Sequence, residues 1–244
     1  PHNPTGRVWP EERLRALGEC ARRRDLLVLS DEIYAGLTFD GLRHRPMATL
    51  PGLRPRTITV GGFSKTYAMT GWRVGFLAGP APVVRKILQV HYPLVHCASG
   101  VSQLAALGAL ERADNDVAEI RQTLQARRDV LWEALEQVSG LRCVRPDGSL
   151  FAFPALPETG MSSLEFARFL VSEVGLAVVP GTEFGPEGEG YIRLSLTAPA
   201  ATLREGVGRL AQALALISAA GPTSPARGGP AGVAAAPQGN RGET

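Results

Sequence analysis

Short, continuous apolar runs alternate with helical segments in the first part of the chain, and this alternation is the strongest constraint on its fold. The runs are LLVL at 26–29, TITV at 57–60 and VGFLAG at 74–79, and each leads into glycine or polar residues. An apolar run of this length is typical of a parallel strand that is buried on both faces. The segment 9–25, before the first run, has apolar residues at helical spacing. Helices that alternate with buried strands predict an α/β layer.

The pattern changes after Gly140. Before it, the chain is predicted to be helical from 82 to about 112, with an interruption near Tyr92-Pro93, and again over a long amphipathic stretch at 117–138. After it, short strand-like runs mix with two further helices. The runs are LRCVRP, SLFAFPAL, LAVVPG and YIRLSL, and the helices cover 163–174 and 202–216.

A change of domain is therefore predicted inside the long helix. We expect one domain over residues 1–120 and a smaller one over 121–217. Residues 218–244 are mostly Ala, Gly and Pro and lack the apolar periodicity that packing requires. This tail is expected to be disordered.

Composition argues against several kinds of partner. The net charge of +3 is mild, and no block of Lys and Arg alternates with aromatic residues, so neither nucleic acid nor membrane is an expected partner. Cys20, Cys97 and Cys143 are far apart, and the four histidines are scattered, so no metal site is expected. We interpret the cysteines as reduced, buried thiols of a cytoplasmic protein.

Polar residues follow two of the apolar runs. Ligands of open α/β sheets bind beyond the carboxyl ends of the strands, so these positions are candidate site residues. They are Asp31 and Tyr34 after the first run, Ser64 and Lys65 after the second, Arg73 beyond the next turn, and Asn3 before the first helix. Each one alone has a commoner explanation, such as a helix cap, a loop lysine, an ion-pair partner, a turn residue or a core aromatic.

The combination of these six residues is more specific than any one of them. An aldehyde cofactor with a pyridine ring and a phosphate needs an amine, a carboxylate at the ring nitrogen, donors to the ring oxygen, and a hydroxyl with a guanidinium for the phosphate. The six residues supply all of these groups. The neighbouring Gly61 and Gly62 are interpreted as leaving room for such a ligand to approach the backbone.

Four segments of the chain resemble one known family. They are NPTG at 3–6, SDEIYAGLTFDG at 30–41, GGFSKTYAMTGWRVGFLAGP at 61–80 and VVPGTEFGPEGEGYIRLSL at 178–196. In combination and order they are similar to the class I and II aminotransferases of pyridoxal 5'-phosphate (PLP) fold type I. The sequences DEIYAGL and AMTGWRVGF most resemble those of the bacterial aspartate and aromatic branch. The resemblance covers the chain to about residue 217. It implies part of the PLP-binding large domain, with a mostly parallel sheet, followed by a smaller α+β C-terminal domain.

The resemblance also implies roles for individual residues. Lys65 is implied to be the catalytic residue, bonded to the cofactor aldehyde and moving a proton at the substrate. The remaining implied cofactor contacts are Asp31 at the ring nitrogen, Asn3 and Tyr34 at the ring oxygen, and Ser64 and Arg73 at the phosphate. Arg193 is implied to bind the substrate α-carboxylate, with Asn3 beside it. Taken alone, Arg193 has the pattern of a solvent-facing arginine on a half-buried strand.

The chain also departs from the family pattern. The stretch that precedes NPTG in family members is not in the sequence, and Gly62 stands where some members carry a second phosphate-binding serine. We therefore expect a chain that is inactive alone and that exposes apolar sheet edge.

Partners and alternative functions follow from the same resemblance. It implies amino acid and 2-oxo acid substrates and a homodimer. Two alternatives stay open: a related PLP lyase of the carbon–sulfur or decarboxylating type, and a non-catalytic aminotransferase-like sensor domain of a transcription regulator. Product analysis separates the first from an aminotransferase, and an upstream DNA-binding domain would favour the second.

Overall fold

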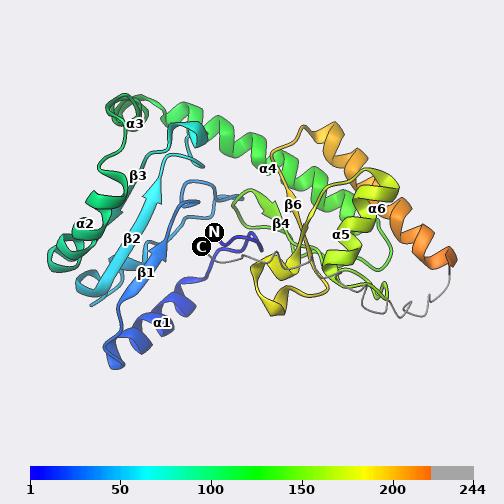
Figure 1. The fold of residues 1–244 in the computed structure, drawn as a ribbon, viewed down its shortest axis with the longest axis horizontal. Coiled ribbons are helices and arrows are strands. Elements are labelled where there is room, and N and C mark those ends of the chain that lie inside the picture. The colour runs from blue at the N-terminus through cyan, green and yellow to red at the C-terminus, as the bar shows by residue number, and fades with distance from the viewer. Residues whose placement is uncertain (221–244) are drawn as a thin grey trace, which may run out of the picture.

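The computed structural model describes residues 1–220, which form two lobes joined by a long helix (Figure 1). The first lobe contains the strands β1 (Val28–Asp31), β2 (Thr57–Gly62) and β3 (Gly75–Ala78) and the helices α1 (Glu11–Arg23), α2 (Ala81–Val95) and α3 (Gly100–Arg112). The second contains β4 (Phe151–Ala152), β5 (Val179–Pro180), β6 (Ile192–Ser195), α5 (Ser163–Val174) and α6 (Ala200–Ala220). Helix α4 (Asp114–Glu136) crosses from one lobe to the other (Figure 1). The predicted α/β class is confirmed.

Short 3-10 helices complete the described elements. They are Met47–Thr49, Arg54–Arg56, Thr70–Trp72, Gly181–Phe184 and Pro186–Gly188.

The first sheet has the strand order β1-β2-β3. Strands β1 and β2 are parallel, so Asp31 lies opposite Val60, whereas β2 and β3 are antiparallel. The three strands lie where the apolar runs predicted them, but burial on both faces was wrong for β1 and β3. Leu29 is 70% exposed and Phe76 is 53% exposed. Phe76 contacts Gly61 and the ring of Phe63, but these contacts leave about half of its surface accessible.

The helices that follow the first sheet differ in one boundary from the prediction. The interruption expected at Tyr92-Pro93 lies further along, because α2 continues through Pro93 to Val95. The helix stops where His96 adopts a φ of +62°, which cannot continue a right-handed helix. Helix α3 then begins at Gly100.

The second lobe has an antiparallel sheet with the order β4-β6-β5. Phe151 pairs with Ser195, and Val179 pairs with Arg193. The run LRCVRP is not a strand as expected, because it makes only a single bridge, between Arg142 and Ala155.

The end of α6 bears on the expected tail. The helix continues to Ala220, so residues 218–220 are helical, and the rest of the expected disordered tail lies outside the described residues.

The main hydrophobic core lies in the second lobe. It contains side chains of α4, α5, β6 and α6, among them Leu131, Phe166, Ile192 and Leu210. The same core includes residues from the segment after β1, namely Tyr34, Leu37 and Phe39. This segment of the first half therefore packs with the second half. A domain boundary between residues 120 and 121 stays a prediction.

The cysteines are free, as expected, but they are less buried than predicted. Cys20 and Cys97 are exposed because they lie on the solvent side of α1 and in the α2–α3 connection, while Cys143 is partly buried. Burial raises the pKa of the Cys143 thiol to about 11. Within residues 1–220 no group of three or more metal-ligating side chains comes together. None of the helices described here has the length and apolar character needed to cross a bilayer.

Candidate active site

The turn after β1 presents Asp31 and Tyr34. Asp31 ends the strand, and its Oδ1 accepts a hydrogen bond from the backbone N–H of Ile33 at 3.1 Å. The turn is tied to β2 because the N–H of Glu32 donates to the carbonyl of Val60 at 2.8 Å. Tyr34 is buried, whereas Asp31 is exposed. Burial raises the pKa of the Tyr34 hydroxyl; the nearby Arg193 opposes this rise, and Asp31 adds to it.

The turn after β2 presents Ser64 and Lys65. Gly61 and Gly62, the last two residues of β2, have a different role from the one expected. A Cβ at Gly61 would collide with the ring of Phe76, and one at Gly62 would lie 3.2 Å from the Cα of Gly75. The glycines therefore allow β2 and β3 to pack closely, rather than leaving space for a ligand.

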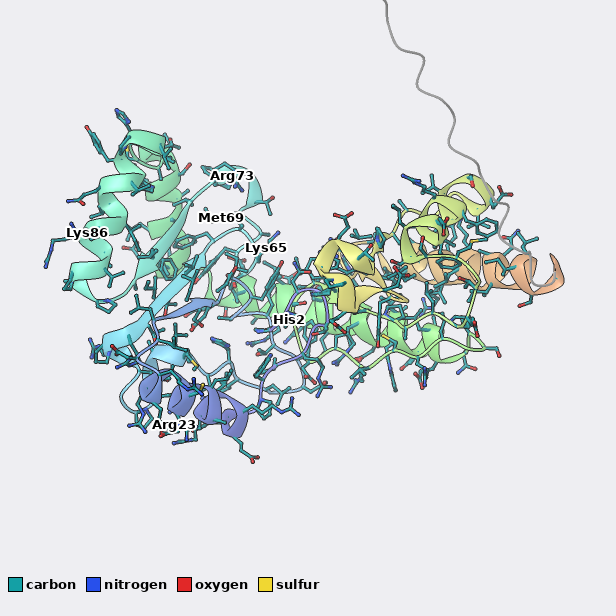
Figure 2. All side chains as sticks on the ribbon, turned by 60° about the horizontal axis from the view of Figure 1, so that its bottom comes forward. His2, Arg23, Lys65, Met69, Arg73 and Lys86 are labelled. Carbon is teal, nitrogen blue, oxygen red and sulfur yellow. The ribbon has the colours of Figure 1, made fainter. Side chains whose placement is uncertain are left out.

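Lys65 lies at a cavity between this turn and helix α4. The cavity has a volume of about 560 Å³, and its lining includes Ser64, Lys65, Ile120, Leu124 and Leu150. Figure 2 shows Lys65 toward the middle of the molecule, with Met69 and Arg73 further out along the same segment. Both Ser64 and Lys65 are partly buried.

Arg73 lies further along the same segment than Lys65 (Figure 2). It adopts a left-handed backbone conformation with a φ of +51°, and its Nη1 donates to the carbonyl of Thr70 at 3.1 Å. Thr70 lines the same cavity as Lys65. Arg73 is exposed, and this one hydrogen bond leaves other donors of its guanidinium available for a ligand.

Arg193 and Asn3 meet, although they are 190 residues apart in the chain. The Nη1 of Arg193 donates to the Oδ1 of Asn3 at 2.8 Å. The guanidinium also lies between two aromatic rings, 4.1 Å from the centroid of Phe151 and 4.7 Å from that of Phe184. Burial lowers the pKa of Arg193, and Tyr34 opposes this shift. Because Tyr34 also contacts Phe151 edge to face at 6.0 Å, these side chains form one cluster.

Sequence reasoning missed Phe151 and Phe184. The signal for Phe151 lies in strand pairing. Phe151 pairs with Ser195, and Ser195 lies on the same face of β6 as Arg193 because the two are two residues apart. Phe184 ends the short 3-10 helix Gly181–Phe184, which is too short for periodicity to indicate the direction of a side chain.

The candidate residues fit a cofactor that carries an aldehyde, a pyridine ring and a phosphate. Among residues 1–220, Lys65 has no carboxylate within ion-pair distance, Ser64 Oγ has no hydrogen-bond partner, and Asp31 makes only its bond to Ile33. An amine, a hydroxyl and a carboxylate oxygen at neighbouring strand ends are thus left for a ligand. Such a set matches the amine, phosphate and ring-nitrogen contacts that the cofactor requires.

The α/β fold of the described chain is that of the fold type I aminotransferases. Residues 1–210 match the family described as aminotransferase class I and II, and the chain belongs to this family. Members of this family use pyridoxal 5'-phosphate. The recognition of the family from its four segments is thereby confirmed.

Named relatives are similar over most of the chain. A putative aminotransferase of Bacillus subtilis, YugH, is 42% identical over 210 residues, which are 86% of this chain and 54% of that protein. Aromatic-amino-acid aminotransferase 2 of Thermococcus litoralis is 41% identical over 216 residues, which are 88% of this chain and 55% of that protein. The chain thus spans about half the length of the curated relatives that it matches.

Solved structures give the same result for the fold. The aromatic aminotransferase of Pyrococcus horikoshii superposes with a TM-score of 0.86 at 38% identity, over 89% of this chain and 59% of that one. A double mutant of the aspartate aminotransferase of Thermus thermophilus superposes with a TM-score of 0.81 at 35% identity, over 87% of this chain and 55% of that one.

Proposed function

We propose that the protein containing these residues moves an amino group between an L-amino acid and a 2-oxo acid, with PLP as its cofactor. One observation supports this most directly: Lys65, Ser64 and Asp31 lie at neighbouring strand ends. Among residues 1–220, the amine of Lys65, the hydroxyl of Ser64 and one carboxylate oxygen of Asp31 have no polar partner. The named relatives are aminotransferases, which favours this function over the lyase and sensor alternatives.

The polar groups around the cofactor would each have one task. Lys65 would hold the aldehyde, Asp31 would keep the ring nitrogen protonated, and Ser64 with Arg73 would bind the phosphate. The Oδ1 of Asn3 is occupied by Arg193, so its amide N–H groups remain to donate to the ring oxygen. Tyr34 can donate to the same oxygen because a tyrosine hydroxyl is protonated at neutral pH. Burial raises its pKa further.

The substrate would be held by Arg193. Its planar guanidinium can bind an α-carboxylate with two parallel hydrogen bonds. Contacts with Phe151, Phe184 and Asn3 restrict the orientation of the guanidinium, so less side-chain entropy is lost on binding. The bound cofactor supplies the electron withdrawal that makes the substrate Cα acidic. The amine of Lys65 would then move a proton between the substrate Cα and the aldehyde carbon of the cofactor.

The compartment and the oligomeric state are also proposals. A cytoplasmic location accords with the three free cysteines. A homodimer with the site at the subunit boundary is implied only by the family resemblance.

Reduction with borohydride in the presence of PLP, followed by peptide mass mapping, tests the cofactor site. The chain contains two lysines, Lys65 and Lys86, and Lys86 is exposed on α2, away from the site (Figure 2). We expect an adduct on Lys65, its loss in Lys65→Ala, and its retention in Lys86→Ala. An adduct that maps to Lys86 and persists in Lys65→Ala would contradict the proposal.

Assays on the protein, or on the longer protein that contains this chain, then test the reaction. We expect a 2-oxo acid product from an amino donor, and a loss of at least about a hundredfold in kcat for Lys65→Ala. Release of ammonia or sulfide without transfer to an acceptor would indicate a lyase instead.

A further inference from the structure

Arg128 is a buried cation in the middle of α4 with partners in two loops. Its side chain is 1% exposed, and its guanidinium lies 5.0 Å from the centroid of Phe39. Nη1 and Nη2 donate to the two carboxylate oxygens of Asp40 at 2.9 and 2.8 Å, and Nη1 also donates to the carbonyl of Pro146 at 2.7 Å. A buried charge is stable only when it is fully hydrogen-bonded, so these partners hold both loops against α4.

The two loops that Arg128 joins run side by side. The N–H of Phe39 donates to the carbonyl of Asp147, and the N–H of Ser149 donates to the carbonyl of Leu37, each at 2.8 Å. Their spacing is tight, because a Cβ at Gly148 would collide with the carbonyl oxygen of Leu37. A change in the position of one loop therefore moves the other.

The far ends of these loops reach the candidate active site. Tyr34 begins the first loop, and Phe151, which follows the second, carries the guanidinium of Arg193 on its ring. The second loop also holds the first turn of the chain, since the carbonyl of Gly6 accepts hydrogen bonds from the N–H groups of residues 147 and 148 at 2.9 Å. That turn carries Asn3.

We propose that Arg128 is a positioning residue for the active site. By fixing residues 37–40 against residues 146–149, it sets the placement of Tyr34 relative to Arg193. Arg128 makes no contact with either side chain, so its effect passes through the two loops. The inference rests on the proposed function, in which Tyr34 contacts the cofactor and Arg193 binds the substrate.

Arg145 is a matched control for Arg128. Besides Asp40, Arg128 also pairs with Asp129, to whose Oδ1 its Nε donates at 2.6 Å. Arg145 forms ion pairs with the same two carboxylates, Asp40 at 3.4 Å and Asp129 at 2.6 Å. Its side chain is 43% exposed, and it does not bind the carbonyl of Pro146. Loss of Arg145 therefore removes a charge from the cluster but leaves the two loops joined through Arg128.

The test compares Arg128→Met with Arg145→Met in the holoenzyme, after folding of each variant is checked by circular dichroism. Met fills most of the space of Arg128 but has no donors. We expect Arg128→Met to raise the KM for the amino donor about tenfold or more, because a displacement of about 1 Å at a site is costly. The pH midpoint of the absorbance of the lysine-bound cofactor should also shift, because Tyr34 moves. Arg145→Met should change neither quantity.

Arg128→Lys is the second variant, and it decides the matter if the Met variant does not fold. It keeps a cation at Asp40 but not the fork that also reaches Pro146, so it should show the same changes at smaller size. A folded Arg128 variant with a lower Tm but with the KM and the midpoint of the wild type would overturn the positioning role. Equal changes in Arg145→Met would overturn it too. A wild-type protein without the Lys65 adduct and without transfer activity refutes the proposed function instead.

Discussion

Ser149 combines two unfavourable features at one position. It is fully buried with a φ of +66°, and its hydroxyl has no hydrogen-bond partner among the described residues. A buried hydroxyl without a partner costs about 1–3 kcal/mol. We expect Ser149→Ala to raise the free energy of unfolding by about 1 kcal/mol in chemical denaturation.

Ser163 provides the control for this prediction. It is as fully buried as Ser149, but its hydroxyl bonds to Glu189 and to Thr182. Ser163→Ala should therefore lower the free energy of unfolding by about 1 kcal/mol. The explanation fails if both substitutions destabilise the protein to the same degree.

Individual site residues could be found in the sequence where they belong to a local motif. Asp31 and Lys65 each come within a few residues of the end of an apolar run, so their positions at strand ends were predictable. In the cluster around Arg193, Asn3 and Tyr34 were named from the family segments, but Phe151 and Phe184 were not, because no local motif marks their contact with the guanidinium. Only the paired strands of the folded chain bring these together.

Helix α5 shows how local signals define a complete element. Ser162 caps it, because the Ser162 hydroxyl accepts from the N–H of Glu165 at 3.3 Å and the Glu165 carboxylate accepts from the N–H of Ser162 at 2.9 Å. Ser162→Ala should lower the free energy of unfolding by about 1 kcal/mol. The control is Ser172→Ala on the exposed side of the same helix, for which a change within about 0.5 kcal/mol is expected. Equal effects would argue against the cap.

The same helix explains why some boundaries were predictable. The cap at Ser162 and the glycine at 175, with a φ of +63°, bound α5 at the predicted residues 163–174. The run LRCVRP has the composition of a strand, yet it pairs with the rest of the chain only through the single bridge between Arg142 and Ala155. Strand formation depends on a partner, and the sequence of one segment does not specify the partner.

The pairing of Arg128 with Asp40 should make the stability of the molecule sensitive to acid. Hydrogen bonds from Arg128 hold the pKa of Asp40 below its usual range. A carboxylate with a lowered pKa stabilises the folded state above its unfolded pKa of about 3.9, and this stabilisation is lost as the pH falls through the folded value. The Tm difference between the wild type and Asp40→Asn should therefore be largest near neutral pH and shrink below about pH 4.

Asp25 gives the comparison for the acid experiment. Its side chain is 96% exposed, and it pairs with Arg56 at 3.1 Å. Exposed pairs of this kind contribute about 0–1 kcal/mol, so Asp25→Asn should show a small Tm difference across the same pH range. A wild-type advantage over Asp40→Asn that stays constant down to pH 3 would contradict the role of the Asp40 carboxylate.

The sequence predicted the α/β class and the order of elements, but not how the two halves share a core. Tyr34, Leu37 and Phe39 lie in the first half by number and pack with the second. They contact residues more than 80 positions later, such as Arg128 over the ring of Phe39 and Phe151 at the ring of Tyr34. Periodicity within a segment carries no information about such contacts.

The hydrogen bond between Asn3 and Arg193 has a consequence for biosynthesis. The two residues are 190 positions apart, so the cluster around Arg193 cannot form until nearly all of the described chain has left the ribosome. At typical rates of synthesis this delay is roughly 10–40 s. During it, the turn after β1 lacks the core that later covers Tyr34 and Leu37, and its apolar side chains are accessible to chaperones. Contacts this distant in sequence also slow folding itself, since a large loop must close before they are gained.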